Sequence, residues 1–328
     1  MGPQRIIVIG ASAGGFGALR RLFGALDPSL PAAVCVVLHT RPDGQHLNKA
    51  LGKLSRLQVE MAADGPLNAG VIYVAPPDRH LVIDRNVMVL LDGPKENRSR
   101  PSIDVLFRSA AVAYRETVIG VVLTGLLDDG TAGLFYVKRH GGTTIVQDPK
   151  DAEFSSMPEN ALAHVSIDYT VPLDKMGSLL NRLASEPRRI RAREFSFLPR
   201  NTYNTIREED ETSATPSAYT CPDCDGPLLR IQDGSPVRFR CRVGHAFGLN
   251  SLTFAQSEHV EQRLWSALQS LKARAELEDA LKFSAKTMGE TDKMEALAKQ
   301  SAYSRHAAAQ IEKILLNLLN NEDASALE

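Results

Sequence analysis

Short hydrophobic runs of strand length recur along the first 184 residues and alternate with turn residues and amphipathic stretches. Three of the runs, Ile6 to Ile9, Ala33 to Leu38 and Val118 to Leu123, are apolar throughout, as strands buried on both faces of a sheet must be. The segments between them have room for crossover helices. The pattern predicts an α/β fold with a doubly wound, mostly parallel sheet. The turn-forming triplet Asp84-Arg85-Asn86 predicts a β-hairpin insertion. The runs are Ile6 to Ile9, Ala33 to Leu38, Val71 to Ala75, Leu81 to Ile83, Val87 to Leu91, Val118 to Leu123 and Thr143 to Gln147.

A helical period replaces these runs in the last part of the chain. One apolar stripe runs from Leu264 to Ala275 at spacings of four, three and four residues, and a second runs from Ile311 to Leu319. Gly289 to Asp292 forms a natural break between them. We therefore expect an α-helical hairpin or coiled coil over 251–320, followed by a polar tail, 321–328. The stripes consist of Leu264, Leu268, Leu271 and Ala275, and of Ile311, Ile314, Leu315, Leu318 and Leu319.

Polar and charged residues dominate the stretch between these two regions, 185–220. A cluster of arginines is followed by the acidic and polar run from Glu208 to Ser213, which is typical of a linker. The cluster could bind an acidic partner or simply be solvated. Its members are Arg188, Arg189, Arg191 and Arg193.

Composition excludes several classes of protein. Lys and Arg number 38 and Asp and Glu 39, so the formal charge of −1 gives no overall attraction to nucleic acid or to an anionic membrane. No apolar run approaches the roughly 20 residues of a membrane span. The segment from Met1 to Arg5 lacks the features of a signal peptide. We expect a cytoplasmic protein that binds no nucleic acid and does not insert into a membrane.

The first chemical motif is the small-residue segment from Gly10 to Gly15, directly after the first predicted strand. As a dinucleotide fingerprint it lacks the second glycine, which Ser12 replaces, and His39 stands where an acidic residue would bind ribose. The segment also fits Gly-x-Ser-x-Gly, in which a serine on a tight strand-to-helix turn presents its hydroxyl at the carboxyl edge of the sheet. A turn that merely allows close packing of helix and strand is the third alternative.

Two further strand ends supply partners for Ser12. His39 ends the second run, and Asp128 and Asp129 follow the sixth, so parallel strands would bring all of them to one edge of the sheet. The two acids could bind a metal or cap a helix that begins near Thr131. Alternatively, one of them orients His39 as it takes the serine proton, which gives a Ser-His-Asp triad.

Three cysteines and a histidine form the second motif, Cys221, Cys224, Cys241 and His245, with the spacing C-x2-C-x16-C-x3-H. Two ligand pairs separated by a small hairpin fit a tetrahedral Cys3His zinc ribbon over 221–250. A redox Cys-x-x-Cys is the alternative, but it needs no second pair and usually opens a helix in a βαβ unit. With all four positions filled by protein, we expect a structural zinc and no cofactor for catalysis.

Five blocks within residues 1–184 form a pattern that is more specific than the serine motif alone. They are Ile6 to Gly15, the strand-ending His39, Tyr73 to His80, Asp92 to Pro94 with Asn97 to Asp104, and Gly120 to Gly125 with Asp129-Gly130. In this order they resemble the catalytic domain of the bacterial chemoreceptor protein-glutamate methylesterases, the CheB type. One departure is Leu126-Leu127, where the family usually has Met-Gly. The lost glycine removes backbone freedom near the expected oxyanion site.

The resemblance implies a role for each site residue: Ser12 as nucleophile, His39 as base and Asp129 as its partner, a choice that spacing leaves open. It implies a protein-glutamate O-methylesterase that hydrolyses glutamate methyl esters on the cytoplasmic helices of a methylated chemoreceptor, and it allows deamidation of receptor glutamine. Arg79, His80 and Arg98 lie in matching blocks and could contact substrate or be solvated. The alternative function is a catalytically silent adaptor on a receptor or kinase array.

The resemblance also implies control by a phosphorylated receiver domain. Because the first predicted strand begins at Arg5, we expect no receiver in this chain. Activity would then be controlled by a separate receiver-domain regulator, controlled by the C-terminal regions, or not controlled at all. The polar linker suggests that the ribbon and the hydrolase fold separately. The expected parts are a methylesterase catalytic domain, 1–184, a linker, 185–220, a zinc-ribbon-like module, 221–250, a helical hairpin or coiled coil, 251–320, and a polar tail, 321–328.

Overall fold

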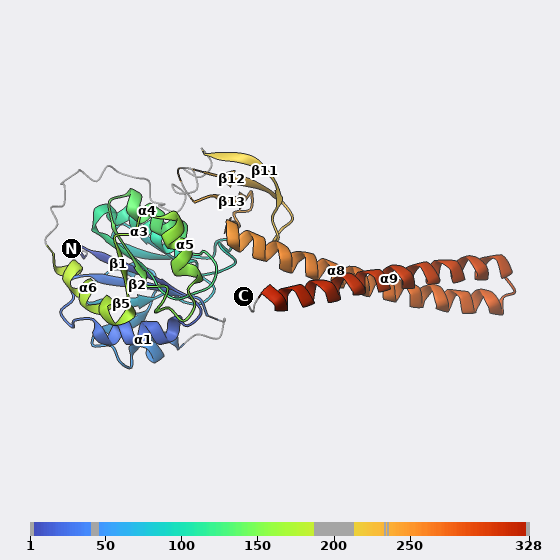
Figure 1. The fold of residues 1–328 in the computed structure, drawn as a ribbon, viewed down its shortest axis with the longest axis horizontal. Helices are drawn as coiled ribbons and strands as arrows, with labels where there is room; N and C mark the ends of the chain where they lie inside the picture. The colour runs from blue at the N-terminus through green and yellow to red at the C-terminus, as the bar shows by residue number, and fades with distance from the viewer. Residues whose placement is uncertain (1–2, 41–45, 187–212, 233, 235, 326–328) are drawn as a thin grey trace. The chain divides into compact units, whose positions relative to one another are not determined.

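The computed structural model describes residues 3–40, 46–186, 213–232, 234 and 236–325. These form two compact units, Met1–Leu252 and Thr253–Glu328. The first unit holds three β-sheets and the second holds a pair of helices (Figure 1). The predicted arginine cluster at 188–193 lies outside the described residues.

A seven-stranded sheet forms the centre of the first unit, with the order β10-β9-β8-β1-β2-β5-β3 and every neighbouring pair parallel. This confirms the predicted doubly wound sheet. The chain proceeds from β1 outward through β2 and then returns to the other side of β1 with β8, so the direction of winding reverses between β1 and β8. The strands are β1 (Ile6–Ala11), β2 (Ala33–Leu38), β3 (Gln58–Met61), β5 (Val71–Val74), β8 (Val118–Val122), β9 (Thr143–Gln147) and β10 (Tyr169–Val171).

Helices cover both faces of this sheet (Figure 1). One buried cluster joins the sheet to α1 and α6, and a second joins the opposite face to α3, α4 and α5. The helices are α1 (Gly15–Ala25), α2 (Leu47–Gly52), α3 (Ile103–Tyr114), α4 (Thr131–Arg139), α5 (Ser156–His164) and α6 (Leu173–Ser185), with the 3-10 turn η1 (Arg115–Thr117) before β8.

The predicted hairpin insertion is present as β6 (His80–Asp84) and β7 (Val87–Leu91), which pair antiparallel. The short strand β4 (Gly65–Pro66) adds to β7 and completes a three-stranded sheet. This sheet leads into the segment of residues 92–102, which returns to the central sheet at α3.

A four-stranded antiparallel sheet carries the cysteine and histidine motif, and we call residues 214–248 the Cys3His module. Its strands are β11 (Ala214–Thr220), β12 (Pro227–Ile231), β13 (Arg238–Cys241) and β14 (Ala246–Gly248). Strand β11 lies within the stretch predicted as linker. It pairs with β12, and its Tyr219 ring packs edge-on against Phe239, with ring centroids 5.3 Å apart. The module therefore begins earlier in the chain than the cysteine spacing indicates.

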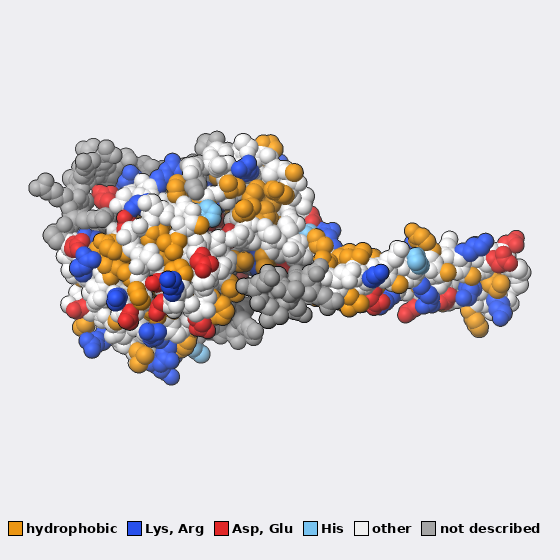
Figure 2. Space-filling model, viewed as in Figure 1, with side chains coloured by type: hydrophobic (Ala, Val, Ile, Leu, Met, Phe, Trp, Pro, Cys, Tyr) orange, Lys and Arg blue, Asp and Glu red, His pale blue; other side chains and the backbone are white. Residues whose placement is uncertain are grey.

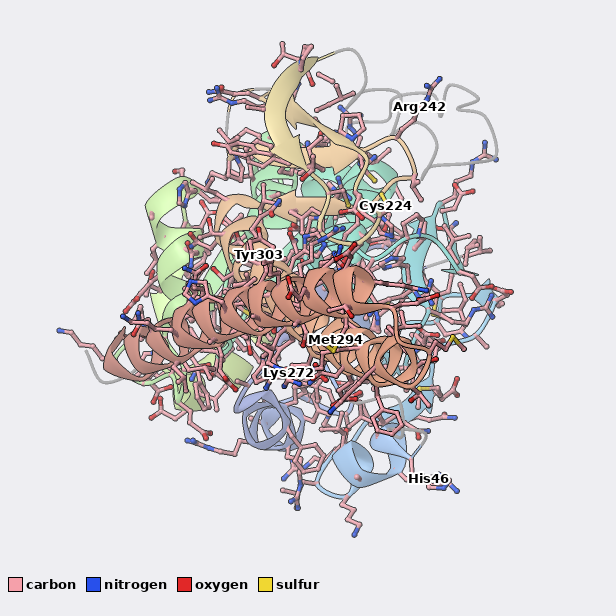
Figure 3. The ribbon with its side chains drawn as sticks, turned by 90° about the vertical axis from the view of Figure 1, so that its right-hand side faces the viewer. His46, Cys224, Arg242, Lys272, Met294 and Tyr303 are labelled. Atoms are coloured by element: carbon pink, nitrogen blue, oxygen red, sulfur yellow. The ribbon has the colours of Figure 1, made fainter. Side chains whose placement is uncertain are left out.

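The second unit is the expected helical hairpin, made by α8 (Leu249–Thr287) and α9 (Thr291–Ser325). Leu268, Ala308 and Leu315 form its buried centre, with Leu264, Leu271 and Ile311 packed against it. The first predicted stripe therefore faces the partner helix, whereas only Ile311 and Leu315 of the second stripe do so, and its Ile314, Leu318 and Leu319 are exposed. Figure 2 shows charged side chains of both signs along the two helices, and Tyr303 on α9 is 71% exposed (Figure 3). Across the described residues, no helix is long and apolar enough to span a membrane.

Candidate active site

Ser12 lies on the turn between β1 and α1, at the carboxyl edge of the central sheet. Its amide donates to the carbonyl of Thr124 (3.0 Å), and its carbonyl accepts from Gly15 (2.8 Å). These bonds tie the serine to the loop after β8, across the point where the winding of the sheet reverses. Ligands of open α/β sheets bind at such switch points.

The three residues expected at this edge contact one another. His39 Nδ1 lies 3.2 Å from Ser12 Oγ, and His39 Nε2 lies 2.9 Å from Asp129 Oδ2. The His39 amide donates to the Ala11 carbonyl (3.1 Å), which fixes the residue after β2 to the end of β1. The arrangement is a continuous chain from hydroxyl to carboxylate. The two ring nitrogens have exchanged places relative to the chymotrypsin-type triad, in which Nε2 faces the serine.

Asp129 is 3% exposed and accepts hydrogen bonds from several directions. The amides of Ile103 (2.8 Å) and Asp104 (3.1 Å), in the first turn of α3, donate to its carboxylate, as do Asn97 Nδ2 (2.9 Å) and Ser102 Oγ (3.0 Å). Burial opposes ionisation, but the hydrogen bonds from His39, Asn97 and Ile103 hold the pKa of Asp129 below its ordinary value. The carboxylate is therefore fixed and negatively charged.

Asp104 binds the opposite helix in a reciprocal way. Its Oδ1 accepts from the amides of Gly130 (3.0 Å) and Gly133 (2.6 Å), the N-cap and a first-turn residue of α4, which begins two residues after Asp129. Burial, followed by the nearby negative charge of Asp129, raises the pKa of Asp104 to about 7. Asp129, in the loop before α4, thus binds the first turn of α3, and Asp104, in α3, binds the first turn of α4.

Asp128 points away from this constellation. Its Oδ2 accepts from the amide of Asn250 (3.0 Å), and its Oδ1 accepts from the amide of Ser251 (3.2 Å) and from the Ser251 hydroxyl. It therefore binds the first turn of α8, whereas the sequence suggested α4 as the helix that one of the paired acids could cap. Burial raises the pKa of Asp128 despite these hydrogen bonds.

The loop after β8 approaches Ser12 closely. A Cβ atom added to Gly125 would lie 2.1 Å from Met157 Sδ and 2.9 Å from Ser12 Cβ, so only glycine fits there. Leu127, in the pair that departs from the family pattern, has a φ of 66°. Its backbone still adopts the left-handed conformation that glycine would supply, held by Ser156 Oγ (3.1 Å) on its amide and by Asn160 Nδ2 (3.0 Å) on its carbonyl.

The N-terminus of α1 supplies amide groups beside Ser12. Gly14, the residue before the helix, has a φ of 72°. Within the described parts of the chain, no backbone carbonyl accepts from the amides of Ala13 or Gly14. Amides at a helix N-terminus next to a nucleophile suit a developing negative charge on oxygen.

Two of the three basic residues in the matching blocks bind other parts of this chain. His80 is fully buried, with Nε2 2.9 Å from the Pro94 carbonyl and Nδ1 accepting from the Ser102 amide (3.2 Å), and burial lowers its pKa. Arg79 pairs with Asp92 (2.9 Å). His80 therefore positions the segment that carries the Asp129 ligands and is not available to substrate.

The Cys3His cluster is assembled as the spacing predicts, and its four ligand atoms lie within 4.8 Å of one another. The Sγ atoms of Cys224 and Cys241 are 3.7 Å apart, and His245 Nδ1 lies 3.7 Å from Cys221 Sγ and 3.5 Å from Cys241 Sγ. A tetrahedral zinc with bonds of about 2.3 Å to sulfur separates its sulfurs by about 3.8 Å. The donors fit that ion, and Cys224 lies in the first ligand loop (Figure 3).

Sequence reasoning assigned no role to Asn97, Ser102 or Asp104, although they lie in one of the quoted blocks. They approach Asp129 because the segment after β7 folds back onto the loop after β8. The available signal was a run of short polar side chains just before an amphipathic helix, which is the usual composition of a helix N-terminus.

Fold and site together define a class of protein: an α/β protein whose parallel sheet carries a serine, a histidine and an aspartate in contact at its switch point. A family model described as CheB methylesterase matches residues 7–180. The chain belongs to the CheB methylesterase family, which confirms the resemblance.

Named relatives match about half of the chain. Protein-glutamate methylesterase/protein-glutamine glutaminase 2 of Methanosarcina mazei is 39% identical over 183 residues, which cover 53% of this chain and 50% of that protein. A Leptospira interrogans protein, whose name gives the same two activities provisionally, is 39% identical over 181 residues, or 54% of this chain and 93% of that protein. The crystal structure of the Thermotoga maritima CheB methylesterase catalytic domain has a TM-score of 0.53 at 35% identity, covering 55% of this chain and 98% of that one.

Proposed function

We propose that the protein is a protein-glutamate O-methylesterase that hydrolyses glutamate methyl esters through Ser12, His39 and Asp129. The observation that carries the proposal is the continuous contact from Ser12 Oγ through the His39 ring to Asp129, in a chain of this family. The substrate class follows from the names of the relatives, which are methylesterases.

The geometry supports a two-step acyl transfer. Asp129 accepts the hydrogen on His39 Nε2, which leaves the Nδ1 lone pair facing the Ser12 hydroxyl. His39 takes the hydroxyl proton as Ser12 Oγ attacks the ester carbonyl, and then gives that proton to the departing methanol. In the second step His39 activates a water molecule, which releases the glutamate carboxylate from Ser12. The amides of Ala13 and Gly14 are suited to hold the oxyanion in both steps.

Deamidation of glutamine is a second candidate activity for the same site. The relatives are named as protein-glutamine glutaminases as well. The chemistry is the same acyl transfer with ammonia in place of methanol as the leaving group.

The partner that suits this chemistry is the cytoplasmic helical part of a methylated chemoreceptor, and we place the protein in the cytoplasm. We propose that any phosphorylation control comes from a separate receiver-domain regulator. The Cys3His cluster, which lies outside the family match, would hold a structural zinc through Cys221, Cys224, Cys241 and His245. Such a zinc would stabilise the fold of the module and take no part in ester chemistry.

Methanol release from methylated receptor preparations tests the function. We expect release by the wild-type protein and a loss of several orders of magnitude in Ser12→Ala and His39→Ala, because residues that act as a unit lose activity together. Ser178→Ala, which removes an exposed hydroxyl from α6, is the matched control. Wild-type turnover in Ser12→Ala would refute the serine mechanism. A silent adaptor would release no methanol and would not be labelled at Ser12 by a serine-directed phosphonate.

A further inference from the structure

Asn97 connects the Cys3His module to the catalytic aspartate. Its Nδ2 donates to Asp129 Oδ1 (2.9 Å) and to Asp104 Oδ2 (2.7 Å), and its Oδ1 accepts from the amide of Gly248, in strand β14 of the module (2.7 Å). Its own amide donates to the Ala246 carbonyl (2.7 Å). The Asn97 side chain, which is 6% exposed, thus donates from its amide nitrogen to the two aspartates and accepts at its amide oxygen from the module.

The turn that presents Asn97 is conformationally costly. Asn97 and Arg98 have φ values of 50° and 66°, and the turn is closed by two backbone hydrogen bonds between Glu96 and Ser99. Two consecutive left-handed residues without glycine persist only where their surroundings hold them. The surroundings here are β14, whose Ala246 forms a bridge to Glu96.

A buried cluster of charged side chains also holds the turn from Glu96 to Ser99 in place. Glu96 is 2% exposed and pairs with Arg108 of α3 and with Arg240 Nη2 (3.1 Å) of β13. Arg240 lies next to the metal ligand Cys241 in the chain. The position of the ligand loop and the position of Glu96 are therefore linked through two adjacent residues of one strand.

The module also reaches the other side of the catalytic loop. A Cβ atom added to Gly248 would lie 2.3 Å from Asp128 Oδ2, and Asp128 binds the residues that follow β14. Asp129 therefore has Asn97, which binds the module, on one side, and on the other side Asp128, which lies against Gly248 and binds the start of α8.

From these contacts we propose that Asn97 is a positioning residue for Asp129, and that the metal-bound Cys3His module holds Asn97 in place, so that esterase turnover depends on the metal. The inference rests on the proposed function of Ser12, His39 and Asp129. Dependence on a metal in this way is a property of this chain, because the family match ends at residue 180 and does not include the module.

Removal of the metal from the full-length protein is the first test. Zinc content is measured together with kcat and KM for a small activated ester, 4-nitrophenyl acetate, which needs no receptor docking. As zinc is removed by a chelator, kcat should fall on the order of ten- to a hundredfold with KM little changed, and one equivalent of zinc should restore it. Amide hydrogen exchange supplies a readout besides activity: the segment from Lys95 to Asp104 should lose protection, while β2 should keep it.

Substitutions separate the bridge from the metal. Asn97→Ala should lower kcat by a similar factor while the protein keeps one zinc, and Asn86→Ala, an exposed turn asparagine, should match the wild type. Because Asn97→Ala also leaves Gly248 without its acceptor, Gly248→Ala serves as a second variant: its added Cβ would meet the Asp128 carboxylate and separate β14 from the catalytic loop, while Asn97 itself is kept. It too should lower kcat with zinc bound.

Two results would overturn the inference: a zinc-free protein with unchanged kcat, or wild-type kcat in both Asn97→Ala and Gly248→Ala. Each kcat is divided by the fraction of protein that is folded, as measured by thermal unfolding, so that unfolding is not mistaken for a loss of positioning. Ser12→Ala is measured on the same ester first. Hydrolysis at the wild-type rate by that variant would refute the proposed function itself, and the two failures are thereby distinguished.

Discussion

Asp128 and Asp129 are adjacent in the chain, yet their carboxylates bind different parts of the molecule. Asp129 lies 2.9 Å from His39 Nε2, whereas Asp128 accepts from amides in the first turn of α8. The backbone turns sharply here: Leu127 before the pair and Gly130 after it both have positive φ. Two acids that spacing could not distinguish therefore have distinct environments.

The two acids should respond differently to the loss of charge. Asp129→Asn keeps the size of the side chain but places an amide where His39 needs an acceptor, and it should lower kcat on the order of 10⁴-fold. Asp128→Asn should lower kcat by about tenfold at most and should reduce the free energy of unfolding by about 1 kcal/mol, because its amide group faces the N–H groups of α8. Steady-state kinetics and urea unfolding measure both quantities. Equal losses of activity would mean that the pair acts jointly, as a shared cap or metal site would.

Leu127 offers a test of backbone strain beside the active site. A left-handed conformation costs a non-glycine residue about 1 to 2 kcal/mol. The step from Leu127→Ala to Leu127→Gly should therefore stabilise the protein by up to about 1 kcal/mol. The same step at Leu126, which is 53% exposed and has no positive φ, should destabilise it by about 0.5 to 1 kcal/mol. Unfolding midpoints of the four variants give both steps, and steps of the same sign at the two positions would show that no strain is released at Leu127.

Asp104 should make stability fall as the pH rises toward neutrality. Burial and then the Asp129 charge raise its pKa from 3.8 to about 7, so between these values the folded protein binds a proton that the unfolded chain releases. This contribution to stability is complete below about pH 4 and is lost as the pH rises through about 7. Asp104→Asn removes the titration while keeping an oxygen for the α4 amides.

The measurement for Asp104 is the free energy of unfolding of both proteins across this range of pH. The difference in stability between wild type and Asp104→Asn should shift in favour of the variant as the pH rises. Arg108, Glu96 and Asp129 also face this carboxyl group and are common to the two proteins. Asp129 stays ionised across this range, because its hydrogen bonds hold its pKa below its ordinary value. A pH-independent difference would contradict the raised pKa.

The buried parts of the fold could be predicted from the sequence because burial on both faces leaves a continuous apolar run. The strands that begin at Ile6, Ala33 and Val118 are predicted in this way, and their shared direction brings the strand ends followed by Ser12, His39 and Asp129 to one edge of the sheet. Strand β3, Gln58–Met61, was missed because it is an edge strand with only partial burial, so polar residues interrupt its pattern. Strand β11 was missed for the same reason.

The supporting residues of the site could not be predicted because their contacts join distant parts of the chain. Asn97 lies 32 positions from Asp129 and 151 positions from Gly248, and no local pattern relates the three. The polar composition of the stretch between the hydrolase and the module likewise gives no sign of the Glu96–Arg240 pair that joins the two parts, because that contact depends on the tertiary fold.

A chain ending at Ala184 tests how far the catalytic domain is independent. Both buried clusters of the central sheet lie within residues 6–184, and the Thermotoga maritima catalytic domain is a chain of similar extent, so the shortened protein should fold and stay in solution. It should hydrolyse 4-nitrophenyl acetate through Ser12, but with kcat reduced to the level of Asn97→Ala, because Asn97 loses its partner in the module and Asp128 loses its partners at the start of α8.

The same shortened chain tests whether the helical hairpin targets the enzyme. The apolar stripe of α8 is largely used inside the hairpin, where Leu268 is fully buried, so docking on a receptor helix would have to use other residues. We therefore expect the shortened chain and Asn97→Ala to release methanol from methylated receptor at the same rate, each normalised to its rate on the small ester. A further loss of tenfold or more in the shortened chain would instead assign receptor selectivity to the C-terminal regions. No hydrolysis of the small ester by a folded shortened chain would show that the catalytic domain cannot act alone.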